Sequence, residues 1–134
     1  MEFEIVPGAA SDNGRPITLT QGDVRAVQLA KGALRTGIDL LCREMEIPRP
    51  AKILLAGAFG SHIEKRDALQ LGMFPSMEEE EIEVVGNAAG VGAILALCDE
   101  ACFERSREVA KATQVVDLAG HPDFQDMFVQ SLTF

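Results

Sequence analysis

The sequence predicts a single α/β domain in which a mixed sheet of about five short strands is flanked by helices. Two apolar runs, at residues 53–56 and 82–85, each pass directly into a glycine turn and then a helix. This succession is typical of buried strands in an open α/β sheet. The amphipathic stretch 21–45 indicates a long helix that can cover such a sheet. With 134 residues, the chain is long enough to form one compact domain with a core.

The charge of the chain disfavours two classes of partner. The formal net charge is −9 and no cluster of lysine and arginine is present. Nucleic acids and anionic membranes are bound through basic surfaces, so we expect neither as a partner. No apolar run approaches the roughly 20 residues that span a bilayer. The first residues are acidic, where a secretory signal is basic.

The three cysteines predict a reducing, cytoplasmic setting rather than a disulfide framework. Cys98 and Cys102 are spaced to share one side of a helix, but no further thiolates or histidines complete a closed metal site. We therefore expect no metal in this chain, and buried or half-buried thiols instead.

The N-terminal elements follow from local patterns. Residues 2–6 alternate polar and apolar side chains and predict a strand, and residues 17–20 predict a second. Thr20, with Asp23 three residues on, is typical of a capping box at the start of a helix over 21–45. The prolines at 48 and 50 end that helix.

One side of this long helix is apolar, and a lysine interrupts it. The stripe contains Val24, Val27, Leu34, Ile38, Leu41 and Met45, with Lys31 in the missing position. Two interpretations of Lys31 remain open. Either its stem lies on apolar surface while its ammonium reaches water, or the stripe opens onto a ligand crevice there. In the second case Lys31 meets an anion or a ribose, and Gln28, one turn earlier, shares that role.

The remaining elements alternate short strands and helices. We expect helices over about 65–71, 88–97, 100–112 and 124–132, and a last short strand at 115–118. Gly72 is a natural helix terminator and Asn87 a natural N-cap. The acidic run 78–81 predicts a solvated loop.

The two glycine turns are the leading candidates for a binding site. Glycine lets backbone approach a ligand closely, and a helix that begins after such a turn presents free N–H groups to anions. Neither turn matches a P-loop or a dinucleotide fingerprint, and glycine packing explains either one equally well. Two such turns after parallel strands lie side by side at the carboxyl edge of a sheet, where α/β proteins bind ligands. Together they predict half of an adenine-nucleotide site.

Four segments also carry a family resemblance. They are TQGDVRAVQLAKGA at 20–33, LAGAFGSHI at 55–63, VGNAAGVGA at 85–93 and HPDFQ at 121–125. The second resembles the adenosine motif of the actin-like, sugar-kinase and chaperone ATPase superfamily. In this order, the four resemble the C-terminal domain of reductive activators of corrinoid proteins, over nearly the whole chain.

This resemblance implies a specific activity. Members of the family are longer proteins with a ferredoxin-like iron–sulfur domain, a linker and an ATPase-like region. They couple ATP hydrolysis to electron delivery to an inactive cobalt(II) corrinoid on a methyltransferase partner. The chain lacks a four-cysteine cluster motif. It therefore resembles one lobe of an actin-like ATPase, a C-terminal domain over 1–134 that is a fragment of a longer iron–sulfur protein. The resemblance implies ATP as the cofactor, with Mg²⁺ in the full-length protein. A 2Fe–2S cluster is expected only in the missing N-terminal region.

The resemblance also assigns site residues. By matched position, Gly57, Ala58, Phe59 and Gly60 line the nucleoside, and Gly86 and Asn87 lie nearby; the stripe adds Gln28 and Lys31.

The resemblance leaves the reaction itself to a second lobe, because no catalytic residue is recognisable here. We expect the isolated domain to be catalytically incompetent. Its expected role is the adenosine-side lobe of an activator that returns corrinoid proteins to cobalt(I). The alternative is a non-hydrolysing interaction module that docks a corrinoid protein or forms a homodimer.

Overall fold

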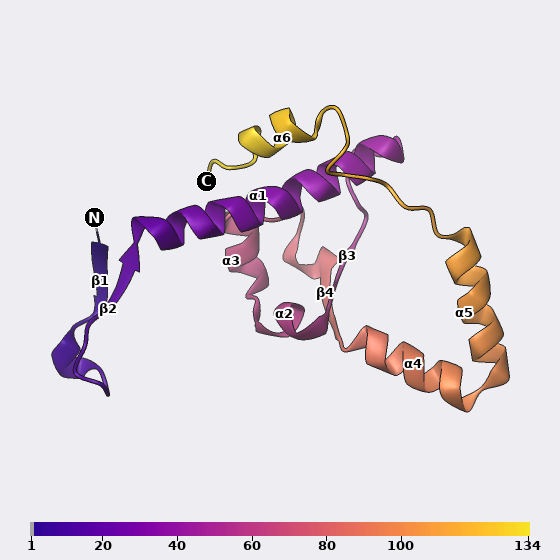
Figure 1. Ribbon diagram of the computed structural model, residues 1–134, viewed down its shortest axis with the longest axis horizontal. Coiled ribbons are helices and arrows are strands. Elements are labelled where there is room, and N and C mark those ends of the chain that lie inside the picture. The colour runs from indigo at the N-terminus through magenta and orange to yellow at the C-terminus, as the bar shows by residue number, and fades with distance from the viewer. Residues whose placement is uncertain (1) are drawn as a thin grey trace.

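The computed structural model describes residues 2–134, apart from the side chains of Phe59 and Ser61 (Figure 1). Its elements, in order, are β1 (Glu2–Val6), β2 (Ile17–Thr20), α1 (Gln21–Glu44), β3 (Ile53–Ala56), α2 (Gly57–His62), α3 (Lys65–Gln70), β4 (Ile82–Gly86), α4 (Ala88–Cys98), α5 (Glu100–Ala112) and α6 (Phe124–Gln130). Single 3-10 turns span Gly8–Ala10 and Glu79–Glu81. The predicted α/β class is confirmed, and most predicted elements begin and end within two residues of the observed ones.

The predicted single sheet of about five strands is wrong. In the described part of the chain, β1 and β2 form an antiparallel pair, and β3 and β4 form a separate parallel pair. The β1–β2 hairpin extends from the start of α1, away from β3 and β4 (Figure 1). The stretch 115–118 is not a strand, and Val115 is 93% exposed. Its β-branched residues favour an extended backbone, but a strand also needs a neighbour to bond with.

The start of α1 is fixed as the sequence predicts. The Thr20 side chain accepts a hydrogen bond from the Asp23 backbone N–H at 3.1 Å, and Asp23 Oδ2 accepts one from the Thr20 backbone N–H at 2.8 Å. This reciprocal pair is a complete capping box. It satisfies backbone N–H groups at the helix end and fixes the residue at which α1 begins.

The buried face of α1 is not the predicted apolar stripe. Val27, Leu34 and Leu41 are exposed, and the buried positions are Lys31, Gly32, Thr36, Leu40 and Cys42. The reason is that α1 is covered from two directions over its central turns. A Cβ on Gly32 would lie 3.0 Å from Leu132, which follows α6. Ile38 packs against the core on another side.

The core is small and lies beside α1. It is formed by Ala68 of α3, Phe74 and Ile82 of β4, with Ile53 and Leu55 of β3 packed against it. Since residues alternate along β3, Leu54 points outward and is exposed. The β3–β4 pair is therefore covered on one face in the described part, where the sequence predicted cover on both.

The helices α4 and α5 pack on each other and project away from β3 and β4 (Figure 1). Every residue of α4 is apolar or glycine, yet none of them is buried. Leu97, near its end, is 87% exposed. Among the described residues, no helix combines the length and the apolar character that crossing a membrane requires.

Candidate functional site

The two glycine turns lie side by side. β3 and β4 run parallel, and Ala56, the last residue of β3, pairs with Gly86, the last residue of β4. Both strands end at this edge, where β3 is followed by α2 and β4 by α4. The predicted adjacency of the two turns is confirmed. Because both strands end here, backbone groups of both turns face the same region.

Gly57 and Gly86 both need to be glycine for their backbone conformation. Their φ angles are +81° and +64°, in the left-handed region that other residues rarely adopt. A Cβ built on either would meet no described atom within 4 Å. The stretch 57–60 is not a free turn as predicted, because it forms the start of α2. Only Gly57 makes the turn itself.

Gly60 and Ala58 have internal contacts. A Cβ on Gly60 would lie 2.9 Å from the Leu55 Cβ and 3.0 Å from its carbonyl group, so glycine here lets α2 pack on β3. The Ala58 carbonyl lies 2.9 Å from His62 Nδ1. Gly60 thus has a packing role that sequence alone left open. The Phe59 side chain falls outside the described residues.

Asn87 begins α4, as predicted. Its Oδ1 accepts a hydrogen bond from the Gly90 backbone N–H at 3.0 Å, which is the N-cap arrangement. The start of α4 therefore lies directly after Gly86, with its partial positive charge at the edge that Gly57 also borders. This edge therefore combines two glycines with positive φ angles, no described atom close to either Cβ position, and the N-terminus of a helix.

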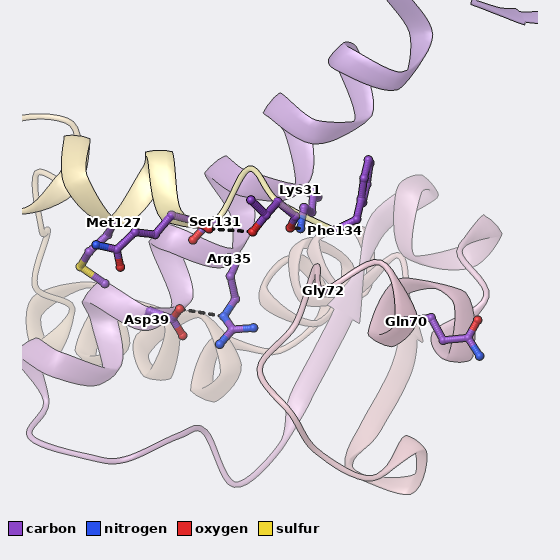
Figure 2. A pocket seen from close by; sticks show the side chains of 10 residues that line it. Lys31, Arg35, Asp39, Gln70, Gly72, Met127, Ser131 and Phe134 are labelled. Atoms are coloured by element: carbon purple, nitrogen blue, oxygen red, sulfur yellow. Dashed lines mark hydrogen bonds and ion pairs between the residues drawn. The ribbon is translucent and has the colours of Figure 1, made fainter. Parts of the chain in front are cut away.

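Lys31 lies in a different place, inside a cavity of about 360 Å³ between α1 and the C-terminal segment (Figure 2). It is 3% exposed. Its Nζ donates a hydrogen bond to the Thr133 carbonyl and lies 5.1 Å from the centre of the Phe134 ring. The interpretation in which the ammonium reaches water is therefore wrong. Gln28, one turn earlier, is half-buried and does not line this cavity.

Charges around this cavity are unevenly paired. Arg35 Nε forms an ion pair with Asp39 at 2.7 Å, and its Nη1 donates to the Phe74 carbonyl at 3.0 Å. Lys31 has no carboxylate within ion-pair distance among the described residues. Burial, and then the charge of Arg35, lower the pKa of Lys31. Lys31 is therefore held by the Thr133 carbonyl and the Phe134 ring rather than by a carboxylate within ion-pair distance.

The structure thus brings together only part of the predicted site. One edge of the β3–β4 pair contains Gly57, Gly60, Gly86 and Asn87. This edge, where α2 and α4 begin, is the end of the two strands that points away from α1 (Figure 1). Lys31 instead shares its cavity with Arg35, Asp39, Gly72 and the last two residues. Sequence reasoning missed these partners. The signal for two of them was the spacing of four that puts Lys31, Arg35 and Asp39 on one side of α1.

Comparisons with known proteins give one consistent family. The profile described as the C-terminal domain of RACo, the ASKHA domain, matches residues 1–134. The corrinoid activation enzyme RamQ of Eubacterium limosum is 35% identical over 98% of the chain. A solved structure described as a reductive activator for corrinoid, iron-sulfur protein superposes with a TM-score of 0.84 at 26% identity, again over 98% of the chain. The chain spans 23% of RamQ and 21% of the solved protein.

Proposed function

Because this chain belongs to the family of RACo C-terminal ASKHA domains, we propose that it is the adenosine-side lobe of an ATP-dependent reductive activator. The activator returns the cobalt(II) corrinoid protein of a methyltransferase system to the active cobalt(I) state. The chain is then a single C-terminal domain of a longer cytoplasmic iron–sulfur protein. The relatives' descriptions as activators of corrinoid proteins support this proposal.

The observation that carries the nucleotide part is the pairing of Ala56 with Gly86. It sets two positive-φ glycines and the capped start of α4 at one sheet edge. The flat base and the sugar of a nucleoside can lie directly against backbone where no side chain intervenes. Glycine allows this close contact because it has no Cβ. The N–H groups at the start of α4 suit acceptor atoms of the ligand.

In this proposal each site residue has a role. Backbone of Gly57, Ala58, Phe59 and Gly60 lies along the nucleoside, and Gly86 and Asn87 border it from the second turn. The phosphates and Mg²⁺ belong mainly to a second lobe of the longer protein. Closing the two lobes around ATP is what would couple hydrolysis to the activator's redox step, so this lobe alone does not hydrolyse ATP efficiently.

The iron–sulfur cluster does not fit this chain. Four cysteine thiolates are the usual ligands of a 2Fe–2S cluster. Here Cys42 is buried in α1, while Cys98 and Cys102 lie at the α4–α5 junction. No group of three or more potential metal ligands occurs among the described residues. In this proposal, the electron that reduces cobalt(II) comes from a cluster elsewhere in the longer protein, and this chain contributes nucleotide binding.

A second candidate function is supported by the exposed apolar surface of α4. Val91, Ile94, Leu95 and Leu97 are all exposed, and a helix that is apolar on every side is normally buried. As an interaction module, the chain would dock a corrinoid protein or a second copy through this helix, and its glycines would only pack.

Thermal unfolding with nucleotide separates the two candidates. The proposed function predicts that ATP or ADP raises the Tm of the protein that contains both lobes, since a ligand at 100 times its Kd adds about 2.7 kcal/mol of stability. Absence of any shift at millimolar nucleotide would overturn it. Under the interaction candidate, nucleotide has no effect, while the chain co-elutes with a corrinoid protein on a sizing column and Leu97→Glu abolishes that complex.

A further inference from the structure

The β1–β2 hairpin has one apolar face, and this face is exposed. Phe3 pairs with Leu19, so the two side chains lie on the same face, and Ile17, two residues before Leu19, shares it. The exposed fractions of Phe3, Ile17 and Leu19 are 70%, 52% and 40%. Glu4 pairs with Thr18 on the opposite, polar face. The hairpin therefore has the two-sided pattern of a sheet that packs on a neighbour.

The core of the chain does not cover this face. Two strands alone are at best marginally stable in water, and an apolar sheet face is normally buried against another element. The hairpin extends away from β3 and β4 (Figure 1). Within the described part, the buried apolar residues all lie outside the hairpin, and they are Leu40, Cys42, Ala68, Phe74 and Ile82. The cover that the hairpin needs is therefore not supplied by these residues.

A hollow joins the apolar face to the first turns of α1. Its volume is about 230 Å³. The apolar side chains that line it are Phe3 and Leu19 of the hairpin and Val24 of α1, and the polar ones are Glu2, Thr20 and Gln21. In protein interfaces, the side chains that contribute most to binding fill apolar pockets inside a polar rim. The hollow is thus a place for an anchoring apolar side chain.

The charge beside the hollow favours a basic neighbour for that anchor. Glu2 lines the hollow, Glu4 lies two residues further along β1, and neither strand contains a lysine or an arginine. Neither carboxylate forms an ion pair among the described residues. A second copy of the chain would bring the same carboxylates and nine surplus negative charges to this surface. Like charges across an interface oppose binding, whereas a lysine or arginine favours it.

The rest of a longer protein can supply this cover permanently. The hairpin exposes its apolar face whenever the cover is absent. A segment of the same polypeptide is held near the hairpin at high effective concentration, while a separate protein has to reach it by diffusion. The chain spans 23% of RamQ and 21% of the solved activator, so each is more than four times as long as the part that matches.

We propose that the apolar face of the hairpin is an interface with another segment of the longer protein, which inserts an apolar side chain into the hollow and places a lysine or arginine beside Glu2. The interface takes from the proposed function only that the chain is one domain of a longer protein, and it involves neither the glycine turns nor α4. It holds the hairpin, and with it the start of α1, against the rest of that protein.

The test is the rate at which N-ethylmaleimide alkylates single introduced cysteines in the full-length protein, measured by mass spectrometry of the peptide that contains each one. Phe3→Cys and Ile17→Cys probe the apolar face, and Glu4→Cys, beside Phe3 but on the polar face, is the matched control. If the interface is closed in about nine-tenths of the molecules, the two apolar-face cysteines react about tenfold more slowly than the control. Equal rates at all three positions would overturn the interface.

Protein concentration and added partner identify what covers the face. Protection that is present without a corrinoid protein and is independent of protein concentration is the expected result for a segment of the same polypeptide. Protection that appears only at high concentration would indicate a second copy, and protection that appears only with a corrinoid protein would indicate that partner. Either of these two results would overturn the proposal.

The anchoring hollow is tested by filling it. Val24→Arg places a long charged side chain there and should raise the alkylation rate of Ile17→Cys in the full-length protein. Leu29→Arg changes an exposed residue of α1 that does not line the hollow, and should leave that rate unchanged. An unchanged rate with Val24→Arg would overturn the anchor. Alkylation is measured without nucleotide, so failure of the interface and failure of the nucleoside site are seen separately.

Discussion

Ala56 pairs with Gly86 across the two parallel strands, and this single register contact places both glycine turns at one edge. A shift of the register by one residue would move Gly86 away from Gly57 and turn the side chains of β4 to the opposite face. The observed register keeps Ile82 in the core and the turns adjacent. Stability of the core and geometry of the candidate site are therefore linked through β4.

Gly57→Ala is expected to destabilise the chain and to remove the nucleotide response. The left-handed conformation at φ +81° costs a residue with a Cβ roughly 1–2 kcal/mol. Gly14→Ala is the matched control, because Gly14 has φ +70° and equally open surroundings in the β1–β2 loop. Urea unfolding should give similar losses for both. Only Gly57→Ala should abolish the Tm increase with ADP in the two-lobe protein. If Gly14→Ala reduced this ADP response as much as Gly57→Ala does, the result would contradict the site.

Gly60→Ala and Gly92→Ala should have opposite effects on stability. A Cβ at Gly60 would press on Leu55 at 2.9 Å, and overpacking of this kind costs about 1–3 kcal/mol. At Gly92, within α4, a Cβ would meet no described atom within 4 Å. Alanine there should stabilise by up to about 1 kcal/mol through helix propensity. Chemical denaturation of both variants tests this, and a stabilising Gly60→Ala would show that α2 does not pack closely on β3.

Asn87→Ala should lower the free energy of unfolding by about 1 kcal/mol, because the Gly90 N–H loses its cap. Asn87→Asp should retain the stability, since a carboxylate accepts the same bond and suits the helix N-terminus. Far-UV circular dichroism during urea unfolding measures both. Equal stability of Asn87→Ala and the natural chain would contradict the capping role, and a nucleotide effect of Asn87→Asp would reveal contact with the ligand's negative charge.

The Arg49–Glu81 pair should make stability depend on pH in the acidic range. Arg49 donates to both carboxylate oxygens, at 3.0 and 2.9 Å, and these bonds, followed by one from the Glu78 backbone N–H, lower the pKa of Glu81. A lowered carboxyl pKa gives stability that is present above the ordinary value of 4.5 and is lost as pH falls through the folded-state value. The Tm of the natural chain should therefore fall on acidification.

Arg49→Gln should lower the Tm at pH 7 and make its decrease below pH 4.5 shallower. Arg105→Gln removes a single-bonded pair with Glu108 on the surface of α5 and serves as the control. If both variants keep the acid dependence of the natural chain, the pair does not carry it.

Local signals in the sequence were sufficient for the elements. The capping box at Thr20, the left-handed Gly72 after α3 and the Asn87 cap are determined by neighbouring residues, and all three were predicted. The adjacency of Gly57 and Gly86 was predicted because parallel strands leave a sheet at the same edge.

Long-range packing limited the rest of the prediction. Which side of α1 is buried depends on where α6 and α3 come to rest, and periodicity along α1 does not contain that information. The same holds for Lys31, whose partners Thr133 and Phe134 are about 100 residues away. The prediction of a strand at 115–118 was wrong because the preference of these residues for an extended backbone does not supply a neighbouring strand to pair with.

The bare apolar surface of α4 makes the solubility of the isolated chain depend on its charge. At neutral pH, nine surplus negative charges keep copies apart. Acidification toward the isoelectric point near 4.6 removes this repulsion while Leu97 and its neighbours stay exposed. The chain should then precipitate at moderate acidity through colloidal attraction, before its helices unfold, and high salt should have a similar effect by screening.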